Sequence, residues 1–187
     1  MSDQIYRRKN VGVIGSSSVS NEVAAEAKEV GKLLCRMGVN LVCGGMGGVM
    51  EEACSGFAEQ RMELEGKGCG VTVGILPGAS SSDANPFVDI AIPTSMGIMR
   101  NFLVVQSADL LIAVAGGSGT LSEMSIAWQH GKSIIALGGT GGWAGELAGK
   151  RIDSRRPDTV KKAVSIEDVE KSIRSILFGG TKEEDEK

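Results

Sequence analysis

Short apolar runs alternate with longer amphipathic stretches along most of the chain. The runs are rich in valine, isoleucine and leucine, and most are continuous, which is typical of strands covered on both faces. The candidate strands are residues 11–14, 40–43, 71–76, 88–92, 110–114 and 133–137. Only residues 88–92 alternate in polarity, which predicts a more exposed strand.

The stretches between these runs carry helix signals at their ends. Ser20 suits the N-cap of a helix that runs to about residue 37, and Gly38 follows it as a C-terminal stop. The other predicted helices cover about 48–65, 97–107, 120–130 and 165–177. Strands that alternate with helices predict a three-layer α/β fold with a doubly wound parallel sheet.

One domain accounts for the chain. Its 187 residues suit a single core, so we predict one domain over residues 1–180. The connection at 150–158 is polar and predicts a surface segment. The charge run at 181–187 predicts a disordered tail.

Charge and hydropathy exclude several classes of partner. The formal net charge of −3, from 20 basic and 23 acidic residues, gives no electrostatic footprint for nucleic acid or an anionic membrane. No apolar run reaches the roughly 18 residues that a membrane span requires, and no apolar signal region follows the N-terminal charges. We therefore expect a soluble, cytoplasmic protein that binds neither nucleic acid nor membrane.

Cysteine spacing argues against disulfides and zinc. The four cysteines, at positions 35, 43, 54 and 69, form no C-x-x-C pair, and His130 is the single histidine. We expect reduced, mostly buried thiols and no metal site.

Glycine is the compositional outlier, with 27 residues, and much of it follows the predicted strands. The carboxyl ends of parallel strands meet at one edge of a sheet, so these loops should converge there. The candidate ligand-binding residues in them are Gly15, Ser16, Ser17, Gly44, Gly45, Gly47, Gly48, Gly116, Gly117, Ser118, Gly119 and Thr120. A further glycine loop, 138–143, follows the last predicted strand. Backbone N–H groups in such loops bind phosphate, so we predict a site for a phosphate-bearing small molecule.

Two widespread nucleotide-binding motifs are missing from these loops. The first glycine segment lacks the G-x-G-x-x-G fingerprint, and no G-K-[ST] sequence follows a glycine loop. NAD oxidoreduction and NTP hydrolysis are therefore disfavoured.

Arg100 and Glu123 are the candidates for chemistry at this site. A guanidinium in an apolar segment needs an anionic partner, either a phosphate or a carboxylate such as Glu123. An exposed turn or an ion pair between subunits is the alternative for Arg100. Glu123 follows Thr120 at the spacing of a capping box, in which both side chains would satisfy the start of a helix. The carboxylate can serve that purpose and still face a ligand.

Together these segments resemble the LOG-like family. The resemblance covers residues 11–142 and rests on GG-x-GT-x-x-E at 116–123, GG-x-x-GVM at 44–50, and Arg100. It implies a Rossmann-like protein, typically dimeric, that acts as a nucleoside 5′-monophosphate phosphoribohydrolase and cleaves the base from ribose 5-phosphate. It also implies that Arg100 and Glu123 form the catalytic pair and that the glycine loops hold phosphate.

Two positions depart from the pattern usual in that family. Ala115 stands where proline is expected, and Asn101 replaces the lysine that usually follows the arginine. Segments 74–78, 84–86 and 97–101 are closer to a sibling branch that includes the molybdenum cofactor carrier proteins, which bind a pterin phosphate at the equivalent site.

A carrier without turnover is therefore the alternative to a hydrolase, and a nucleotide-sensing module is a third. In each case we place Asn101 among the ligand-binding residues. We expect no required cofactor, a nucleotide, phosphate or molybdopterin as the bound ligand, and a homo-oligomer.

Overall fold

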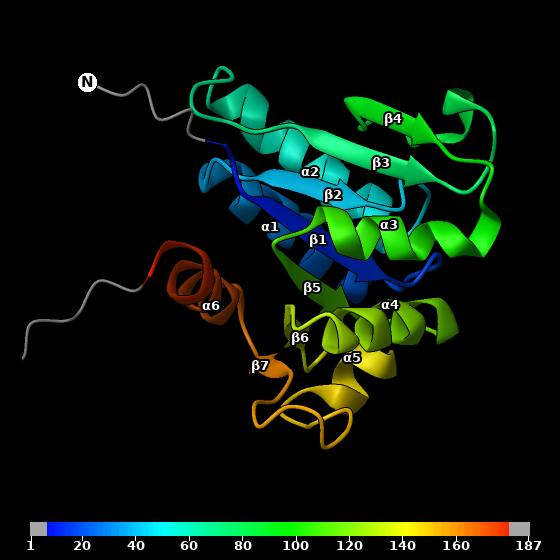
Figure 1. Cartoon of the computed structure of the whole chain (residues 1–187). Coiled ribbons are helices and arrows are strands. Elements are labelled where there is room, and N and C mark those ends of the chain that lie inside the picture. Colours follow the sequence, from blue (N-terminus) through cyan, green and yellow to red (C-terminus); the bar gives the residue numbers. More distant parts are fainter. Residues whose placement is uncertain (1–6, 180–187) are drawn as a thin grey trace, which may run out of the picture.

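The computed structural model describes residues 7–179 and contains a seven-stranded sheet (Figure 1). The strands are β1 (Asn10–Gly15), β2 (Asn40–Cys43), β3 (Thr72–Leu76), β4 (Ile90–Pro93), β5 (Leu110–Val114), β6 (Ser133–Leu137) and β7 (Lys161–Ala163). Their order is β4-β3-β2-β1-β5-β6-β7, and every neighbouring pair is parallel. The predicted tail at 181–187 lies outside the described residues.

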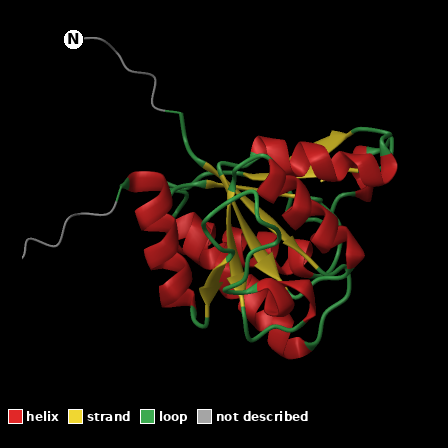
Figure 2. Ribbon diagram, turned by 60° about the horizontal axis from the view of Figure 1, so that its bottom comes forward, coloured by secondary structure: helices red, strands yellow, loops and turns green. Residues whose placement is uncertain are grey.

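Helices cover both faces of this sheet (Figures 1 and 2). They are α1 (Asn21–Arg36), α2 (Val49–Glu63), α3 (Arg100–Ser107), α4 (Ser118–Gln129), α5 (Gly142–Leu147) and α6 (Ile166–Phe178), with short 3₁₀ turns η1 (Ser81–Asp83) and η2 (Gly97–Met99). The first, second and sixth helices pack on one face around Leu33, Phe57 and Ile173. The other three pack on the opposite face, where Val104, Met124 and Ala144 are buried. The predicted three-layer, Rossmann-like α/β fold is confirmed, and no helix within residues 7–179 is long and apolar enough to cross a membrane.

The polarity pattern of each strand matches its burial in the sheet. All five residues of β5, in the middle of the sheet, are buried between the two helical layers. By contrast, β4 lies at one edge and is largely exposed, as its alternating polarity predicted. The short edge strand β7 was not predicted, because its sequence is Lys-Lys-Ala and carries no apolar run.

Two helix starts test the capping predictions. Ser20 is the N-cap of α1, as predicted, and its hydroxyl accepts from the backbone N–H of Val23 at 3.4 Å. The capping box predicted for Thr120 and Glu123 is wrong, because α4 begins at Ser118 with Gly117 as its N-cap. Thr120 lies inside the first turn, where its side chain is buried. The preceding glycines let the chain enter the helix two residues earlier than expected.

Candidate functional site

A cavity of about 280 Å³ lies at the carboxyl ends of β1 and β5. These neighbouring strands mark the point where the order reverses, since the chain continues from β1 to β2 on one side while β5 lies on the other. Open α/β sheets bind ligands at such a point, because the loops diverge there and leave a crevice. The cavity is lined by Val13, Ile14, Gly15, Ser16, Ser17, Gly44, Met50, Arg100, Asn101, Gly117, Ser118, Gly119, Thr120 and Glu123.

Most of the predicted site residues are in this wall. The structure brings together the loops after β1, β2 and β5 with the start of α3. Four predicted residues do not line the cavity: Gly45, Gly47, Gly48 and Gly116. Three lining residues were not predicted, namely Val13, Ile14 and Met50, because an apolar residue in a strand or helix carries no signal that separates a site wall from the core.

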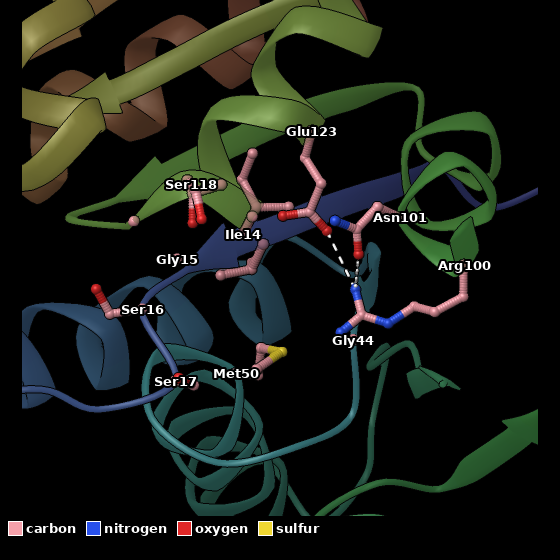
Figure 3. A pocket seen from close by; sticks show the side chains of 14 residues that line it. Ile14, Gly15, Ser16, Ser17, Gly44, Met50, Arg100, Asn101, Ser118 and Glu123 are labelled. Carbon is pink, nitrogen blue, oxygen red and sulfur yellow. Dashed lines mark hydrogen bonds and ion pairs between the residues drawn. The ribbon is translucent and has the colours of Figure 1, made fainter. Parts of the chain in front are cut away.

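The start of α4 forms one polar side of the cavity. Gly117 caps the helix without a side-chain hydrogen bond. The N–H groups in the first turn of a helix have no intrahelical partners. Those of Ser118, Gly119 and Thr120 therefore lie unpaired within the helix at the positive end of the helix dipole. In Figure 3, Ser16 and Ser118 lie to the left of Glu123, and Arg100 lies to its right. This arrangement suits an anion such as phosphate.

Ser16 ties three loops together beside this helix end. Its hydroxyl oxygen accepts from the backbone N–H of Gly116 at 3.0 Å. Its carbonyl oxygen accepts from the N–H of Val49, the first residue of α2, at 2.9 Å. The hydroxyl also carries one proton, which it can donate to a ligand acceptor in the cavity.

The loop that leads into α4 has an unusual backbone at Ala115. This residue has a φ of +51°, in the left-handed region that costs an L-residue roughly 1–2 kcal/mol. Its N–H donates to Thr140 Oγ1 at 2.8 Å. Proline has neither an N–H nor access to a positive φ. Proline, which the resemblance predicts at this position, therefore does not fit the backbone conformation that the chain has at residue 115.

Arg100 and Glu123 form the other polar side of the cavity. Arg100 Nη1 lies 3.3 Å from Glu123 Oε1 and 2.5 Å from Asn101 Oδ1, and Figure 3 shows the three side chains pointing toward one another. The arginine and glutamate side chains are only 12% and 8% exposed. Arg100 is thus paired with Glu123 inside the cavity wall rather than on an exposed turn. Its Nε is buried and has no partner within residues 7–179.

Burial controls the protonation of Glu123. Removal from water raises the pKa of this carboxyl from 4.5 to about 7, and the neighbouring Arg100 guanidinium opposes the rise only in part. A carboxyl that exchanges its proton near neutral pH is suited to acid–base chemistry.

The same carboxyl should make stability depend on pH. The folded chain holds the Glu123 proton more tightly than the unfolded chain, because its pKa is about 7 instead of 4.5, so stability falls as pH rises through this window. We expect the free energy of unfolding of the wild type to decrease by about 3 kcal/mol between pH 5 and pH 8, relative to Glu123→Gln, which does not titrate there. Urea denaturation of both proteins at several pH values measures this difference. Parallel stability curves would contradict the raised pKa.

His130, Trp143 and the four cysteines lie outside the cavity. His130 is the C-cap of α4, and its ring packs edge-to-face on Phe102 at 5.5 Å. Trp143 is 38% exposed, and its backbone N–H donates to the carbonyl of Gly116. Three of the four thiols are buried, in agreement with the prediction, and Cys69 is half-buried. Among the described residues, no three His, Cys, Asp or Glu side chains gather as metal ligands would.

The chain is similar to known proteins in both sequence and structure. It is 42% identical over 127 residues to an uncharacterized protein from Archaeoglobus fulgidus, a match that spans 68% of this chain and 78% of the relative. Its structure is similar to that of the molybdenum cofactor binding protein from Rippkaea orientalis, with 32% identity, 91% and 98% of the two chains covered, and a TM-score of 0.75. It is also similar to the molybdenum cofactor carrier protein from Chlamydomonas reinhardtii, with 29% identity, 92% and 99% covered, and a TM-score of 0.77.

These similarities agree with the resemblance drawn from the glycine motifs. The model of the SLOG cluster4 family matches residues 8–173, which is most of the chain. The chain belongs to the SLOG cluster4 family.

Proposed function

We propose that the cavity binds a phosphorylated, nucleotide-like small molecule, with its phosphate at the start of α4 and its carbon skeleton facing Glu123. One observation carries this proposal: the start of a helix that has no side-chain cap and a buried arginine–glutamate pair line the same cavity. The N–H groups suit a phosphate, and the carboxyl suits a centre that becomes positive.

The two anions of such a complex need not repel each other strongly. Glu123 lies five residues after Ser118 in α4, which is roughly 7 Å along the axis at about 1.5 Å per residue. A phosphate at the first turn therefore leaves room for a sugar between it and the carboxylate. Arg100, beside Glu123, adds a compensating positive charge.

The activity that we propose first is hydrolysis of the N-glycosidic bond of a nucleoside 5′-monophosphate. The bond between C1′ and the base nitrogen breaks, the oxygen of water joins C1′, and the base leaves with a proton. The transition state resembles an oxocarbenium ion, as in glycoside hydrolysis. Ionised Glu123 stabilises this positive charge or accepts a proton from the attacking water, and Arg100 holds the carboxylate in place.

Incubation with AMP tests this activity. Chromatography should show free adenine and ribose 5-phosphate appearing in equal amounts, and CMP, GMP and UMP test the choice of base. The rate should rise with pH through about 7, because ionised Glu123 is the active form. Absence of base release from all four monophosphates would exclude the hydrolase.

A second candidate, a carrier of the molybdenum cofactor, is favoured by the comparisons. Two of the similar structures are named for binding or carrying that cofactor, at 32% and 29% identity over more than nine-tenths of this chain. The backbone donors at the start of α4 would equally suit the phosphate of a pterin. Native mass spectrometry of protein purified from cells that make the cofactor tests this candidate. A retained pterin without hydrolysis of any monophosphate would establish the carrier, and a protein free of pterin that releases base would exclude it.

We also propose that the chain forms a homo-oligomer, as the LOG-like resemblance implies. The segment around Arg100 supports this, because Ile98, Met99 and Phe102 are 74%, 66% and 41% exposed. Apolar side chains grouped in this way are typical of interfaces. We expect Ile98→Glu to lower the molar mass measured by light scattering to that of one chain. A wild-type protein that already has the mass of one chain would contradict the proposal.

A further inference from the structure

The loop that joins β6 to α5 lies against the loop that leads into α4. Three hydrogen bonds connect this loop and the first turn of α5 to the loop that leads into α4. The N–H of Ala115 donates to Thr140 Oγ1 at 2.8 Å, the N–H of Trp143 donates to the carbonyl of Gly116 at 3.0 Å, and the N–H of Ala144 donates to the carbonyl of Ala115 at 2.9 Å. Residues 25 or more apart in the sequence thus form one backbone unit.

The Thr140 hydroxyl is the only side-chain group in this set of bonds. Its oxygen accepts from Ala115, and its proton is donated to the carbonyl of Leu137 at 2.7 Å. Because both bonds are made, the hydroxyl has a fixed direction. It links the carboxyl ends of β5 and β6, which are neighbours in the sheet.

The partner of this hydroxyl is the strained residue of the loop. Ala115 has a φ of +51°, which is energetically unfavourable for alanine, and Gly116 has a φ of +103°. The backbone of Gly142 packs closely against the same two residues. A Cβ at position 142 would lie 2.5 Å from the Gly116 carbonyl oxygen. The bond to Thr140 favours the one conformation in which the Ala115 N–H points at β6.

We infer that Thr140 is a positioning residue for the anion-binding turn of α4. Thr140 does not line the cavity, so it acts through Ala115 and Gly116 rather than by touching a ligand. The conformation at Ala115 sets the direction in which the chain enters Gly117 and the first turn of α4. Loss of the hydroxyl would let the loop relax and would shift the N–H groups of Ser118, Gly119 and Thr120. The inference concerns the proposed phosphate site, and it depends on the proposed function only for the identity of the ligand.

Amide hydrogen exchange tests the inference without any ligand. Thr140→Val keeps the shape of the side chain and removes the hydroxyl, whereas Thr140→Ser keeps the hydroxyl. We expect exchange at the hydrogen-bonded amides of Ala115 and Gly116 to rise about tenfold in Thr140→Val, as loss of one hydrogen bond predicts, and to stay near the wild-type rate in Thr140→Ser. Exchange in the central strand β5 should not change.

A second pair of variants separates positioning from general stability. Glycine adopts a positive φ without penalty, so Ala115→Gly should need the Thr140 bond less. We expect Thr140→Val to raise exchange at the amides of residues 115 and 116 by only about threefold in the Ala115→Gly background, because the two sites are coupled. Equal effects in both backgrounds, unchanged exchange in Thr140→Val, or no rescue by Thr140→Ser would each overturn the inference.

Calorimetry with inorganic phosphate and with AMP completes the test. Thr140→Val should weaken binding of both probes about tenfold, and Thr140→Ser should restore it. Unchanged affinities in Thr140→Val would overturn the inference. If the wild type binds neither probe, the proposed ligand is wrong, and the exchange experiment still decides whether Thr140 positions the loop.

Discussion

Glu123→Gln should lower the rate of AMP hydrolysis by about 10³-fold, within the range of about 10²–10⁴ that a positioned acid or base contributes. Glutamine keeps the shape of the side chain and its place beside Arg100, but it cannot ionise. AMP affinity should therefore change by less than about threefold, because the anion site at the start of α4 is intact. Single-turnover rates and calorimetric affinities measure the two effects separately.

Glu51→Gln is the matched control for this variant. Glu51 lies in the first turn of α2, outside the cavity wall, and its loss removes a negative charge without touching Arg100. It should leave the rate unchanged. The rise in the wild-type rate through pH 7 should also disappear in Glu123→Gln. Full activity in Glu123→Gln would remove this residue from the chemistry.

Ala115→Pro should reduce affinity for phosphate and for AMP by at least about 100-fold. Proline fixes φ near −65° and has no N–H, whereas Ala115 has a φ of +51° and donates to Thr140. The loop must therefore change its path before it reaches Gly117. Calorimetry with both ligands measures the loss, and circular dichroism shows whether the rest of the fold persists.

Ala115→Gly is the control for this substitution. Glycine keeps the N–H and reaches the same φ without strain, so binding should stay within about threefold of the wild type. A proline variant that binds AMP normally would show that the loop tolerates the conformation of the usual family motif. In that case the presence of alanine instead of proline at position 115 would not indicate a different loop conformation.

Much of the fold could be predicted because its signals are local. Continuous apolar runs marked five of the seven strands, and an alternating run marked β4. Ser20 and Gly38 marked both ends of α1. The place of the site followed from topology, since glycine loops after parallel strands must arrive at one edge. The need of a buried guanidinium for an anion made Glu123 one of the partners considered for Arg100, and the structure pairs the two.

The rest depended on contacts between distant segments. Thr140 and Ala115 are 25 residues apart, and nothing in the sequence indicates that one holds the other. The positive φ of Ala115 could not be predicted either, because glycine is the residue that usually indicates a positive φ in a sequence. The raised pKa of Glu123 comes from burial, which is a property of the assembled cavity wall.

The central claim is that one cavity holds a phosphate at the start of α4 and a reacting carbon at Glu123. A crystal structure of Glu123→Gln soaked with AMP tests it most directly, because this variant should bind AMP without consuming it. The account predicts phosphate oxygens within hydrogen-bond distance of the N–H groups of Ser118, Gly119 and Thr120, with C1′ facing the side chain of residue 123. AMP bound with its phosphate elsewhere, or with its sugar turned away from residue 123, would contradict it.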